Sequence, residues 1–256
     1  MGNNVGSKSV FYRLQSQDAD IPMDCPGFDH PFVVIGHRGA AGHEPENTLR
    51  SFRRAVAMGV QAIELDVYLL ENELVVIHDD SLERTTNGTG ALASHTLAGV
   101  RRLDAGAGER IPLLSEVLSS IDEGIGINVE LKGEGTGERL PAYLAAYPRG
   151  HGRILVSSFR HRELAAYREA GGECALGLLF GRSKESLFER ADALEPYAIH
   201  LSVRLASAAL MARIHARGLR VFVYTVNELD VLARLRKGKV DGVFSDYPDR
   251  ILQAIA

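Results

Sequence analysis

The sequence predicts an α/β protein of the TIM (β/α)8 barrel class, on three observations. Apolar segments of strand length alternate with amphipathic helical segments, which is the pattern of a parallel sheet joined by crossover helices. There are eight such strands, the number that closes a barrel, in a chain of 256 residues, which is long enough for one. No glycine-rich phosphate loop follows the first strand, which disfavours the alternative, an open doubly wound sheet.

Strand and helix candidates follow one another along most of the chain. The expected strands cover residues 32–36, 62–69, 126–131, 153–158, 174–180, 198–203, 220–226 and 242–246. The expected helices cover residues 48–58, 113–121, 138–147, 161–170, 184–194, 207–217, 228–237 and 249–255. Apolar residues recur at helical spacing in these segments, as in Leu49, Phe52 and Val56. Gly59 and Gly171 stand where two of the helices should end.

Two features interrupt the barrel repeat after its second strand. An apolar run returns directly after Glu71 and Asn72 and ends at Asp79, which predicts a β-hairpin. Asn72 suits the tight turn because asparagine tolerates a positive φ. Residues 80–112 are rich in Gly, Thr and Ala and lack a strong period, so we expect a small insertion above the barrel rim that covers the site.

The remaining segment, residues 1–31, is polar and contains three prolines. It predicts an N-terminal arm attached to a barrel domain that covers residues 32–256. Its first 20 residues lack the apolar core and cleavage pattern of a secretory signal.

Composition limits the partners and the compartment. The net charge of −4 gives no general attraction to nucleic acid or to an anionic membrane. No apolar run approaches the roughly 20 residues that span a bilayer. Cys25 and Cys174 form no metal-binding spacing and nothing requires a disulfide. We therefore expect a cytoplasmic protein with no nucleic-acid partner and no integral membrane segment; the oligomeric state stays open.

Three acidic residues on two expected strands are candidate metal ligands. Alternate residues of a strand share a face, so Glu64 and Asp66 point to one side and the aliphatic residues between them to the other. If strand 126–131 is the neighbour, about 4.8 Å away, its Glu130 converges with both. Oxygen donors of this kind suit a hard divalent cation, Mg²⁺ or Ca²⁺. The alternative is a structural ion-pair network with nearby cations.

Two histidines are candidate acid–base groups because each stands at the end of an expected strand. His37 directly follows strand 32–36, and His78 ends the strand that returns from the hairpin. Barrels of this class carry their active sites at the C-terminal ends of the strands, and imidazole titrates near neutral pH. We expect structural roles for His95, His151 and His161, and we rank His43 and His200 as weaker candidates, with His200 as a possible pocket wall.

Arg38 and Lys132 are candidate anion-binding groups. Arginine binds phosphate in bidentate fashion, and lysine acts as a point charge. Together with three carboxylates and one divalent cation, these two residues leave a net charge of +1 at the site. A phosphodiester, with one negative charge, would neutralise it, whereas a neutral substrate would leave an excess of positive charge.

Several short motifs follow one another in order between His37 and Pro248. They are His37-Arg38-Gly39, Pro45-Glu46-Asn47-Thr48, Glu64-Leu65-Asp66, His78-Asp79, Arg84-Thr85, Ile111-Pro112-Leu113-Leu114, Glu130-Leu131-Lys132, Ser157-Ser158-Phe159, Tyr224-Thr225-Val226-Asn227 and Ser245-Asp246. Each motif is weak alone, but the ordered set resembles the glycerophosphodiester phosphodiesterase family, in its bacterial cytosolic branch. The resemblance implies a TIM barrel with a small insertion after the hairpin.

The resemblance also implies a role for each candidate. His37 and His78 would be the acid–base pair, and Glu64, Asp66 and Glu130 would bind one divalent cation. Arg38 and Lys132 would hold the phosphate, Glu46 and Asn47 would support the site from the first loop, and Phe159 and Tyr224 would line the pocket. Glu71-Asn72, Tyr224 and Ser245 stand where the family commonly has Asp-Gly, Trp and Thr, which bears on pocket shape and leaving group.

The implied reaction is metal-dependent hydrolysis of glycerophosphodiesters, such as glycerophosphocholine or glycerophosphoethanolamine, to glycerol 3-phosphate and an alcohol. One alternative is a lysophospholipase D, which would need an apolar groove for an acyl chain; the polar 80–112 segment argues against it. The other is a non-catalytic barrel that binds a phosphate ligand. Such a protein should have lost a histidine or an acid, and this chain keeps all five.

Overall fold

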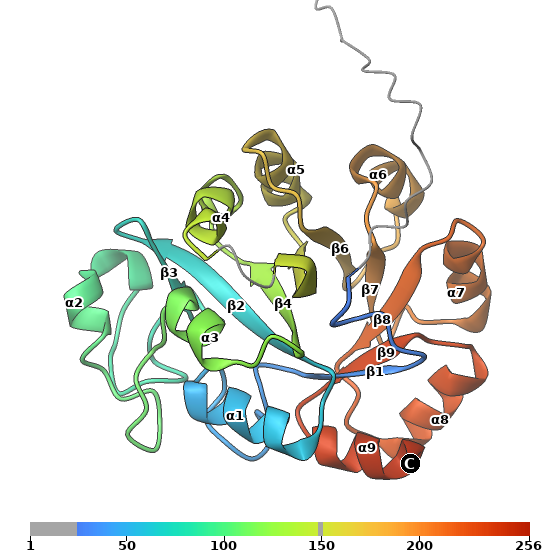
Figure 1. The fold of residues 1–256 in the computed structure, drawn as a ribbon, viewed down its shortest axis with the longest axis horizontal. Coiled ribbons are helices and arrows are strands. Elements are labelled where there is room, and N and C mark those ends of the chain that lie inside the picture. The colour runs from blue at the N-terminus through green and yellow to red at the C-terminus, as the bar shows by residue number, and fades with distance from the viewer. Residues whose placement is uncertain (1–24, 148–150) are drawn as a thin grey trace, which may run out of the picture.

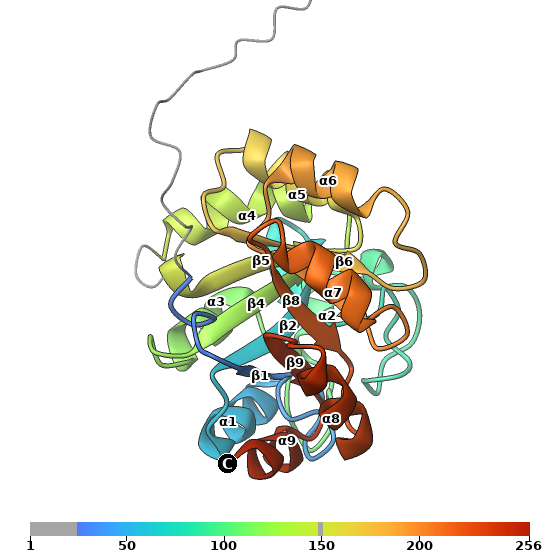
Figure 2. The ribbon, with the colours of Figure 1, turned by 90° about the vertical axis from the view of Figure 1, so that its right-hand side faces the viewer.

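The computed structural model describes residues 25–147 and 151–256, which form a closed parallel barrel with helices around it (Figures 1 and 2). Closure comes from β1 (Val33–Gly36), which pairs in parallel with both β2 (Ala62–Leu70) and β9 (Gly242–Ser245). This double pairing confirms the barrel and excludes an open doubly wound sheet. Residues 1–24 of the expected arm lie outside the described residues.

Every expected strand and helix is present. The other barrel strands are β4 (Gly126–Leu131), β5 (Ile154–Ser158), β6 (Ala175–Phe180), β7 (Ala198–Ser202) and β8 (Arg220–Tyr224). The helices between them are α1 (Leu49–Met58), α3 (Leu114–Ser120), α4 (Thr136–Ala145), α5 (His161–Glu169), α6 (Leu187–Leu194), α7 (Ala208–His215), α8 (Leu229–Lys237) and α9 (Pro248–Ile255), with a short 3₁₀ helix η2 (His151–Arg153) before β5. The expected start of α6 at residue 184 is wrong: Ser186 has a φ of 55°, so the helix begins after it.

The strands bury side chains on both faces, and the two faces differ. Outward-facing aliphatic residues such as Ile63 and Val129 pack beneath the helices, as the alternation along β2 and β4 predicts. Inward-facing Phe222 fills the N-terminal half of the barrel. Phe28 packs against it there, with ring centroids 6.0 Å apart. Burying a side chain of this size contributes about 1.5–3 kcal/mol. The N-terminal half of the barrel is therefore packed, and polar side chains gather at the C-terminal end.

The predicted hairpin joins β2 to β3 (Glu73–Val76) in antiparallel register. Glu71 and Asn72 both have positive φ, 48° and 67°, as a two-residue hairpin turn requires. The strand ends three residues earlier than expected, yet Ile77 N–H still donates to Asp66 O over 3.0 Å. This bond extends the pairing with β2, so the returning chain lies beside the acidic residues of β2.

The insertion, residues 80–112, contains η1 (Leu92–Ser94) and α2 (Leu97–Val100). Its apolar residues Leu92 and Val100 form a separate small core with Val75 and Ile77 of the returning strand. The insertion therefore lies beside the barrel, at the left of Figure 1. None of residues 80–112, all of which the structure describes, lines the cavity at the barrel mouth, so the expectation that the insertion covers the site is wrong.

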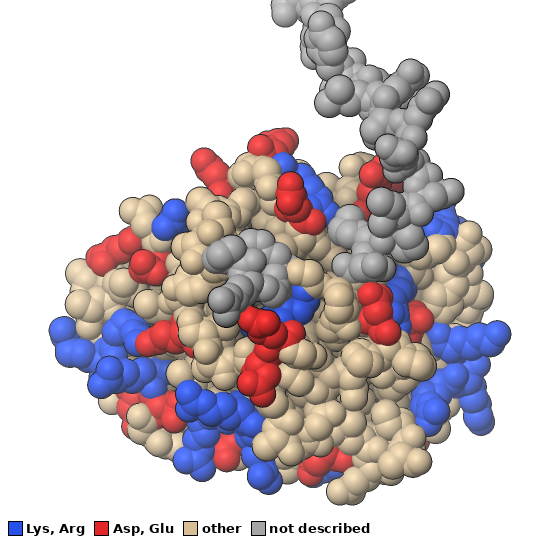
Figure 3. All heavy atoms as spheres, in the orientation of Figure 1, with Lys and Arg blue, Asp and Glu red and all other residues tan. Residues whose placement is uncertain are grey.

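Acidic and basic side chains are intermixed on the face that Figure 3 shows, with basic groups gathered toward its lower left and its right edge. Within the described ranges, no helix is long and apolar enough to cross a membrane. Among the described residues, buried charged side chains include Glu64, Asp66 and Glu130, which lie inside the barrel.

Candidate active site

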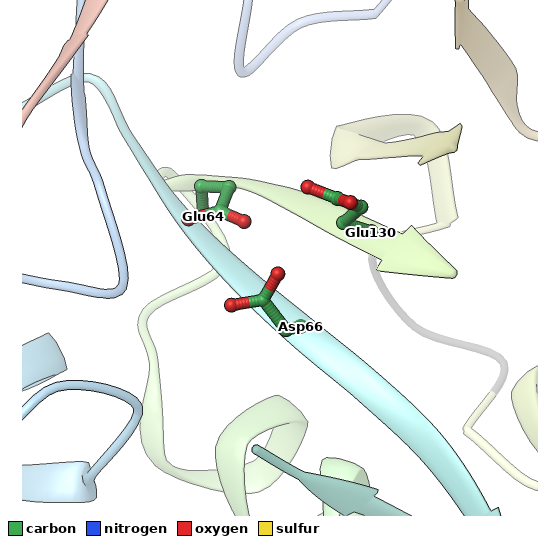
Figure 4. A group of neighbouring side chains, drawn as sticks. All are labelled: Glu64, Asp66 and Glu130. Atoms are coloured by element: carbon green, nitrogen blue, oxygen red, sulfur yellow. The ribbon is translucent and has the colours of Figure 1, made fainter. Parts of the chain in front are cut away.

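Three carboxylates converge inside the C-terminal end of the barrel (Figure 4). Strands β2 and β4 are neighbours in parallel register, with Asp66 opposite Glu130, as the convergence requires. One oxygen each from Glu64, Asp66 and Glu130 lies within 4.8 Å of the others. The three residues are 2%, 1% and 7% exposed. Burial of three like charges this close needs compensating positive charge.

Burial and the charges of its two acidic neighbours raise the pKa of Glu64 well above its usual range. Burial and Asp66 likewise raise the pKa of Glu130 to about 7. Two side-chain cations approach the cluster. Lys132 Nζ lies 2.9 Å from Glu130 Oε1 and 3.5 Å from Asp66 Oδ1, and Arg38 Nε lies 3.4 Å from Asp66 Oδ2. Burial by itself would lower the pKa of Lys132, but its acidic neighbours outweigh burial and raise it.

The ion-pair network that the sequence offered as an alternative is thus present, but two cations do not balance three carboxylates. Within the described chain, Asp66 Oδ1 has no hydrogen-bond partner. A set of buried oxygen donors with an unbalanced negative charge and raised carboxyl pKa values fits a divalent cation of the Mg²⁺ or Ca²⁺ type. The acidic cluster therefore suits such an ion as well as it suits the two neighbouring cations.

The loop between β1 and α1 holds Arg38 and supports the acids. Arg38 has a left-handed backbone with φ 51°, and its N–H donates to Glu64 Oε2 over 2.8 Å. Its Nη1 donates to Glu46 Oε1, also over 2.8 Å. Asn47 Nδ2 donates to Asp66 Oδ2 over 2.9 Å, so the amide fixes the carboxylate from behind. The two supporting residues expected from the first loop, Glu46 and Asn47, do contact the acid–cation cluster.

His37 is held by an aspartate from the other end of the chain. Its Nδ1 lies 2.7 Å from Asp246 Oδ1, and its backbone N–H donates to Ser245 O over 3.0 Å. Asn227 Nδ2 donates to Asp246 Oδ2 over 2.7 Å, which fixes the carboxylate. With the Nδ1 proton assigned to this bond, the Nε2 atom faces the acidic cluster, 4.0 Å from Glu64 Oε2.

His78 stands opposite, two residues beyond β3. Its Nδ1 lies 2.5 Å from Asp79 Oδ1, and its Nε2 lies 3.1 Å from Lys132 Nζ. An ammonium group only donates, so Nε2 accepts, and the ring is neutral in this arrangement. Burial lowers the pKa of His78, and the charges of Lys132 and Arg38 lower it further.

Arg84 of the insertion connects the two sides of the site. Its Nη1 and Nη2 bind both oxygens of Glu46 over 2.7 and 2.8 Å, and its Nε donates to Asp79 Oδ2 over 2.5 Å. Hydrogen bonding to Arg84 lowers the pKa of Asp79 to about 2. One guanidinium thus joins the carboxylate behind His78 to the carboxylate behind Arg38.

A cavity of about 280 Å³ opens between these groups. Its charged side carries both histidines with Arg38, Glu64, Glu130 and Lys132, and its apolar side carries Phe159, Leu179, Tyr224 and Phe244. Phe159 is 44% exposed, meets Tyr224 edge-on at a centroid distance of 5.7 Å, and lies 5.9 Å from Lys132 Nζ. A cavity of this size and polarity fits a small anion with a short carbon chain.

The structure thus brings all eleven predicted site residues to one end of the barrel. Eight of them line the cavity: His37, Arg38, Glu64, His78, Glu130, Lys132, Phe159 and Tyr224. Asp66, Asn47 and Glu46 lie behind them. Sequence reasoning assigned no role to Asp79, Arg84, Asn227 or Asp246. Asp246 directly follows the last strand, so the strand-end rule that selected His37 also points to it.

The remaining candidate histidines lie outside the cavity. His43 Nε2 lies 2.9 Å from Asp249 Oδ1, His95 Nε2 lies 2.9 Å from Thr89 O, and His161 Nε2 lies 3.2 Å from Leu179 O. His200 does not line the cavity; it is fully buried in the barrel between Phe222 and Phe244. The side chain of His151 lies outside what the structure describes.

The family model and the related proteins that match this chain point to the same family. Residues 37–250 match the model of the glycerophosphoryl diester phosphodiesterase family. The chain is 34% identical over 237 residues to a glycerophosphodiester phosphodiesterase of Caldanaerobacter subterraneus subsp. tengcongensis, covering 87% of this chain and 97% of the relative. It is 29% identical to a glycerophosphodiester phosphodiesterase of Bacillus subtilis, over 85% of this chain and 84% of the relative.

Solved structures agree. A phosphodiesterase of Oleispira antarctica, in complex with its product sn-glycerol-3-phosphate, superposes with a TM-score of 0.81 at 33% identity, over 87% of this chain and 96% of that one. A glycerophosphodiester phosphodiesterase of Thermotoga maritima superposes with a TM-score of 0.74 at 26% identity, over 88% of this chain and 98% of that one. The similarity therefore extends over the barrel and its hairpin insertion.

Proposed function

Because the chain belongs to the glycerophosphoryl diester phosphodiesterase family, and so is a phosphoric diester hydrolase, we propose that it hydrolyses glycerophosphodiesters to glycerol 3-phosphate and an alcohol. Glycerophosphocholine and glycerophosphoethanolamine are the substrates we would test first. One observation carries the proposal: two histidines, two cations and the carboxylates Glu64 and Glu130 face a single small cavity, with Asp66 directly behind them.

Arg38 and Lys132 are the proposed phosphate-binding groups. They lie on the same side of the cavity as the acidic cluster, and both are largely buried, so they attract an anion in a medium less polar than water. Glu64, Asp66 and Glu130 would hold one divalent cation, Mg²⁺ or Ca²⁺. When bound there, such an ion neutralises phosphoryl oxygens and the charge that develops during transfer.

The two histidines are the proposed proton carriers. The bond from phosphorus to the leaving alcohol breaks while a new phosphorus–oxygen bond forms, so one proton must leave the nucleophile and another must reach the alcohol oxygen. His78 suits the accepting role because its ring is neutral and lines the cavity; its Nε2 lone pair, which accepts from Lys132 Nζ here, would take the nucleophile's proton once Lys132 binds the phosphate. His37, held by Asp246, then donates to the leaving oxygen.

The nucleophile is either water or the substrate's own glycerol 2-hydroxyl, through a cyclic phosphate. A glycerophosphodiester without that hydroxyl separates the two routes. It would be inert on the cyclic route, and normal turnover would refute that route.

The test is a coupled assay for glycerol 3-phosphate released from glycerophosphocholine, in EDTA and then with Mg²⁺ or Ca²⁺ restored. We expect product only with a metal. Greater activity on lysophosphatidylcholine would indicate a lysophospholipase D, although a 280 Å³ cavity is small for an acyl chain. Saturable binding of glycerophosphocholine without metal-stimulated turnover would indicate a binding protein. The cytoplasmic location stays a prediction from the sequence.

A further inference from the structure

Two uncharged polar atoms in the cavity have no hydrogen-bond partner among the described residues. They are Tyr224 Oη, a donor, and Asn128 Oδ1, an acceptor, and both atoms are buried. Asn128 is 1% exposed, and its Nδ2 donates to Ser157 Oγ over 2.9 Å, which fixes the amide. Buried polar atoms are nearly always paired, so unpaired ones that line a ligand cavity indicate where the polar groups of a ligand belong.

The charged groups in and behind the cavity, in contrast, have partners within the protein. His37 is bonded to Asp246, and Lys132 to Glu130. The two charged-group atoms without a hydrogen bond, Arg38 Nε and Asp66 Oδ1, still lie within ion-pair distance of opposite charges. Tyr224 and Asn128 are therefore the uncharged part of the recognition surface.

The ring of Tyr224 is fixed by its neighbours. It ends β8 and meets Phe159 and Phe244 edge-on, at centroid distances of 5.7 and 6.4 Å. Its hydroxyl lies over Gly181, where a Cβ atom would stand 3.3 Å from Oη. Burial raises the pKa of Tyr224, and the charge of Glu130 raises it further, so the hydroxyl keeps its proton. Tyr224 is a fixed donor on the apolar side of the cavity.

We propose that Tyr224 Oη donates a hydrogen bond to a hydroxyl group of the substrate's glycerol moiety and that Asn128 Oδ1 accepts one. The proposal rests on the proposed function and identifies how its site recognises the alcohol that stays on the phosphate. With the phosphate at Arg38 and Lys132, the glycerol carbons lie against Phe159 and its hydroxyls meet these two atoms. The site therefore selects phosphate esters of a polyhydroxy alcohol over those of a plain alkyl alcohol.

The test compares binding of sn-glycerol 3-phosphate and propyl phosphate by calorimetry, in Mg²⁺, for the unaltered protein and Tyr224→Phe. Propyl phosphate keeps the phosphate and the three carbons but lacks both hydroxyls. We expect Tyr224→Phe to weaken binding of sn-glycerol 3-phosphate about 10-fold and to leave propyl phosphate unchanged. Equal weakening of both ligands, or no change in either, would overturn the proposal.

Two further variants keep the comparison decisive. Tyr224→Leu also removes Oη and supplies no donor, and it replaces Tyr224→Phe if that variant does not fold. Tyr147→Phe is the matched control, because Tyr147 packs on Tyr143 outside the barrel, and it should bind both ligands as the unaltered protein does. The ligands that lack only the 1- or only the 2-hydroxyl then show which hydroxyl Tyr224 contacts.

Failure of this inference and failure of the proposed function give different results. Binding without release of glycerol 3-phosphate from glycerophosphocholine would refute the proposed function, and the binding comparison would still decide the role of Tyr224. Metal-dependent release with an unselective Tyr224→Phe variant would refute only the inference. No binding of sn-glycerol 3-phosphate by the unaltered protein would also overturn it.

Discussion

His37 Nδ1 lies 2.7 Å from Oδ1 of Asp246, which is 209 positions later in the chain. The two residues directly follow β1 and β9, the strands whose pairing closes the barrel. A proposed proton carrier is thus oriented by the carboxylate at the end of the last strand.

We predict that Asp246→Asn lowers kcat about 100-fold, the lower end of what a positioned acid–base group contributes. An amide in place of the carboxylate no longer fixes the Nδ1 proton, so the ring loses its orientation. Steady-state kinetics measure the effect, and His37→Ala should be at least as severe. Normal kcat in Asp246→Asn would show that His37 acts without this bond.

His78→Ala should lose at least 100-fold in kcat while its Tm changes little. The side chain of His78 is 28% exposed at the barrel mouth, so its removal opens no cavity in a packed layer. His161→Ala is the matched control: this buried ring lies 3.2 Å from Leu179 O, and its loss should lower Tm and spare the folded enzyme's activity. The reverse pattern in thermal melts and assays would exchange the two roles.

The pH profile should respond to Arg84 in a defined direction. The pKa of His78 is lowered from its usual 6.5. The ring therefore stays neutral, and the enzyme active, until the pH falls below this lowered pKa. In Arg84→Met the Asp79 carboxylate loses the cation that neutralises it, which raises the pKa of His78. The acid limb of kcat against pH should therefore move to higher pH.

Asp79→Asn provides the opposite case. The hydrogen bond that His78 Nδ1 donates to the Asp79 carboxylate raises the pKa of His78, so its removal should move the acid limb to lower pH. Shifts of the same sign in Asp79→Asn and Arg84→Met would show that neither residue acts through the charge on His78.

The acidic cluster predicts an opposition between stability and metal binding. Removal of one of three buried like charges should stabilise the metal-free protein, so Glu64→Gln in EDTA should melt about 2–4 °C above the unaltered protein, for roughly 1 kcal/mol. The same variant should lose most of the rise in Tm that Mg²⁺ or Ca²⁺ gives. Glu130→Gln should raise the metal concentration needed for activity, and an unchanged metal titration would remove Glu130 from the ligand set.

The site was predictable where a local rule decides side-chain direction. Alternation along β2 fixes Glu64 and Asp66 on one face, and parallel pairing with β4 adds Glu130. The strand-end rule also marks Asp246, but its pairing with His37 depends on barrel closure, which joins the two ends of the described barrel and has no local signal. Arg84 was beyond prediction for another reason: a long side chain reaches Asp79 and Glu46 from an insertion without periodicity.

The predicted position of the insertion, over the site, was wrong for a related reason. The segment around Leu92 and Val100 shows no strand or helix periodicity, so the sequence does not indicate that these residues face Val75 and Ile77. Their packing draws the segment to the side of the barrel and leaves the cavity open.

Closure of the barrel by the β1–β9 pair has a consequence for biosynthesis. His37 is translated 209 residues before its partner Asp246 and the strand that positions it. A nascent chain that lacks β9 has both proposed proton carriers and all three acids, yet its barrel is open between β1 and β8. Activity should thus appear only after β9 has been synthesised and has closed the barrel.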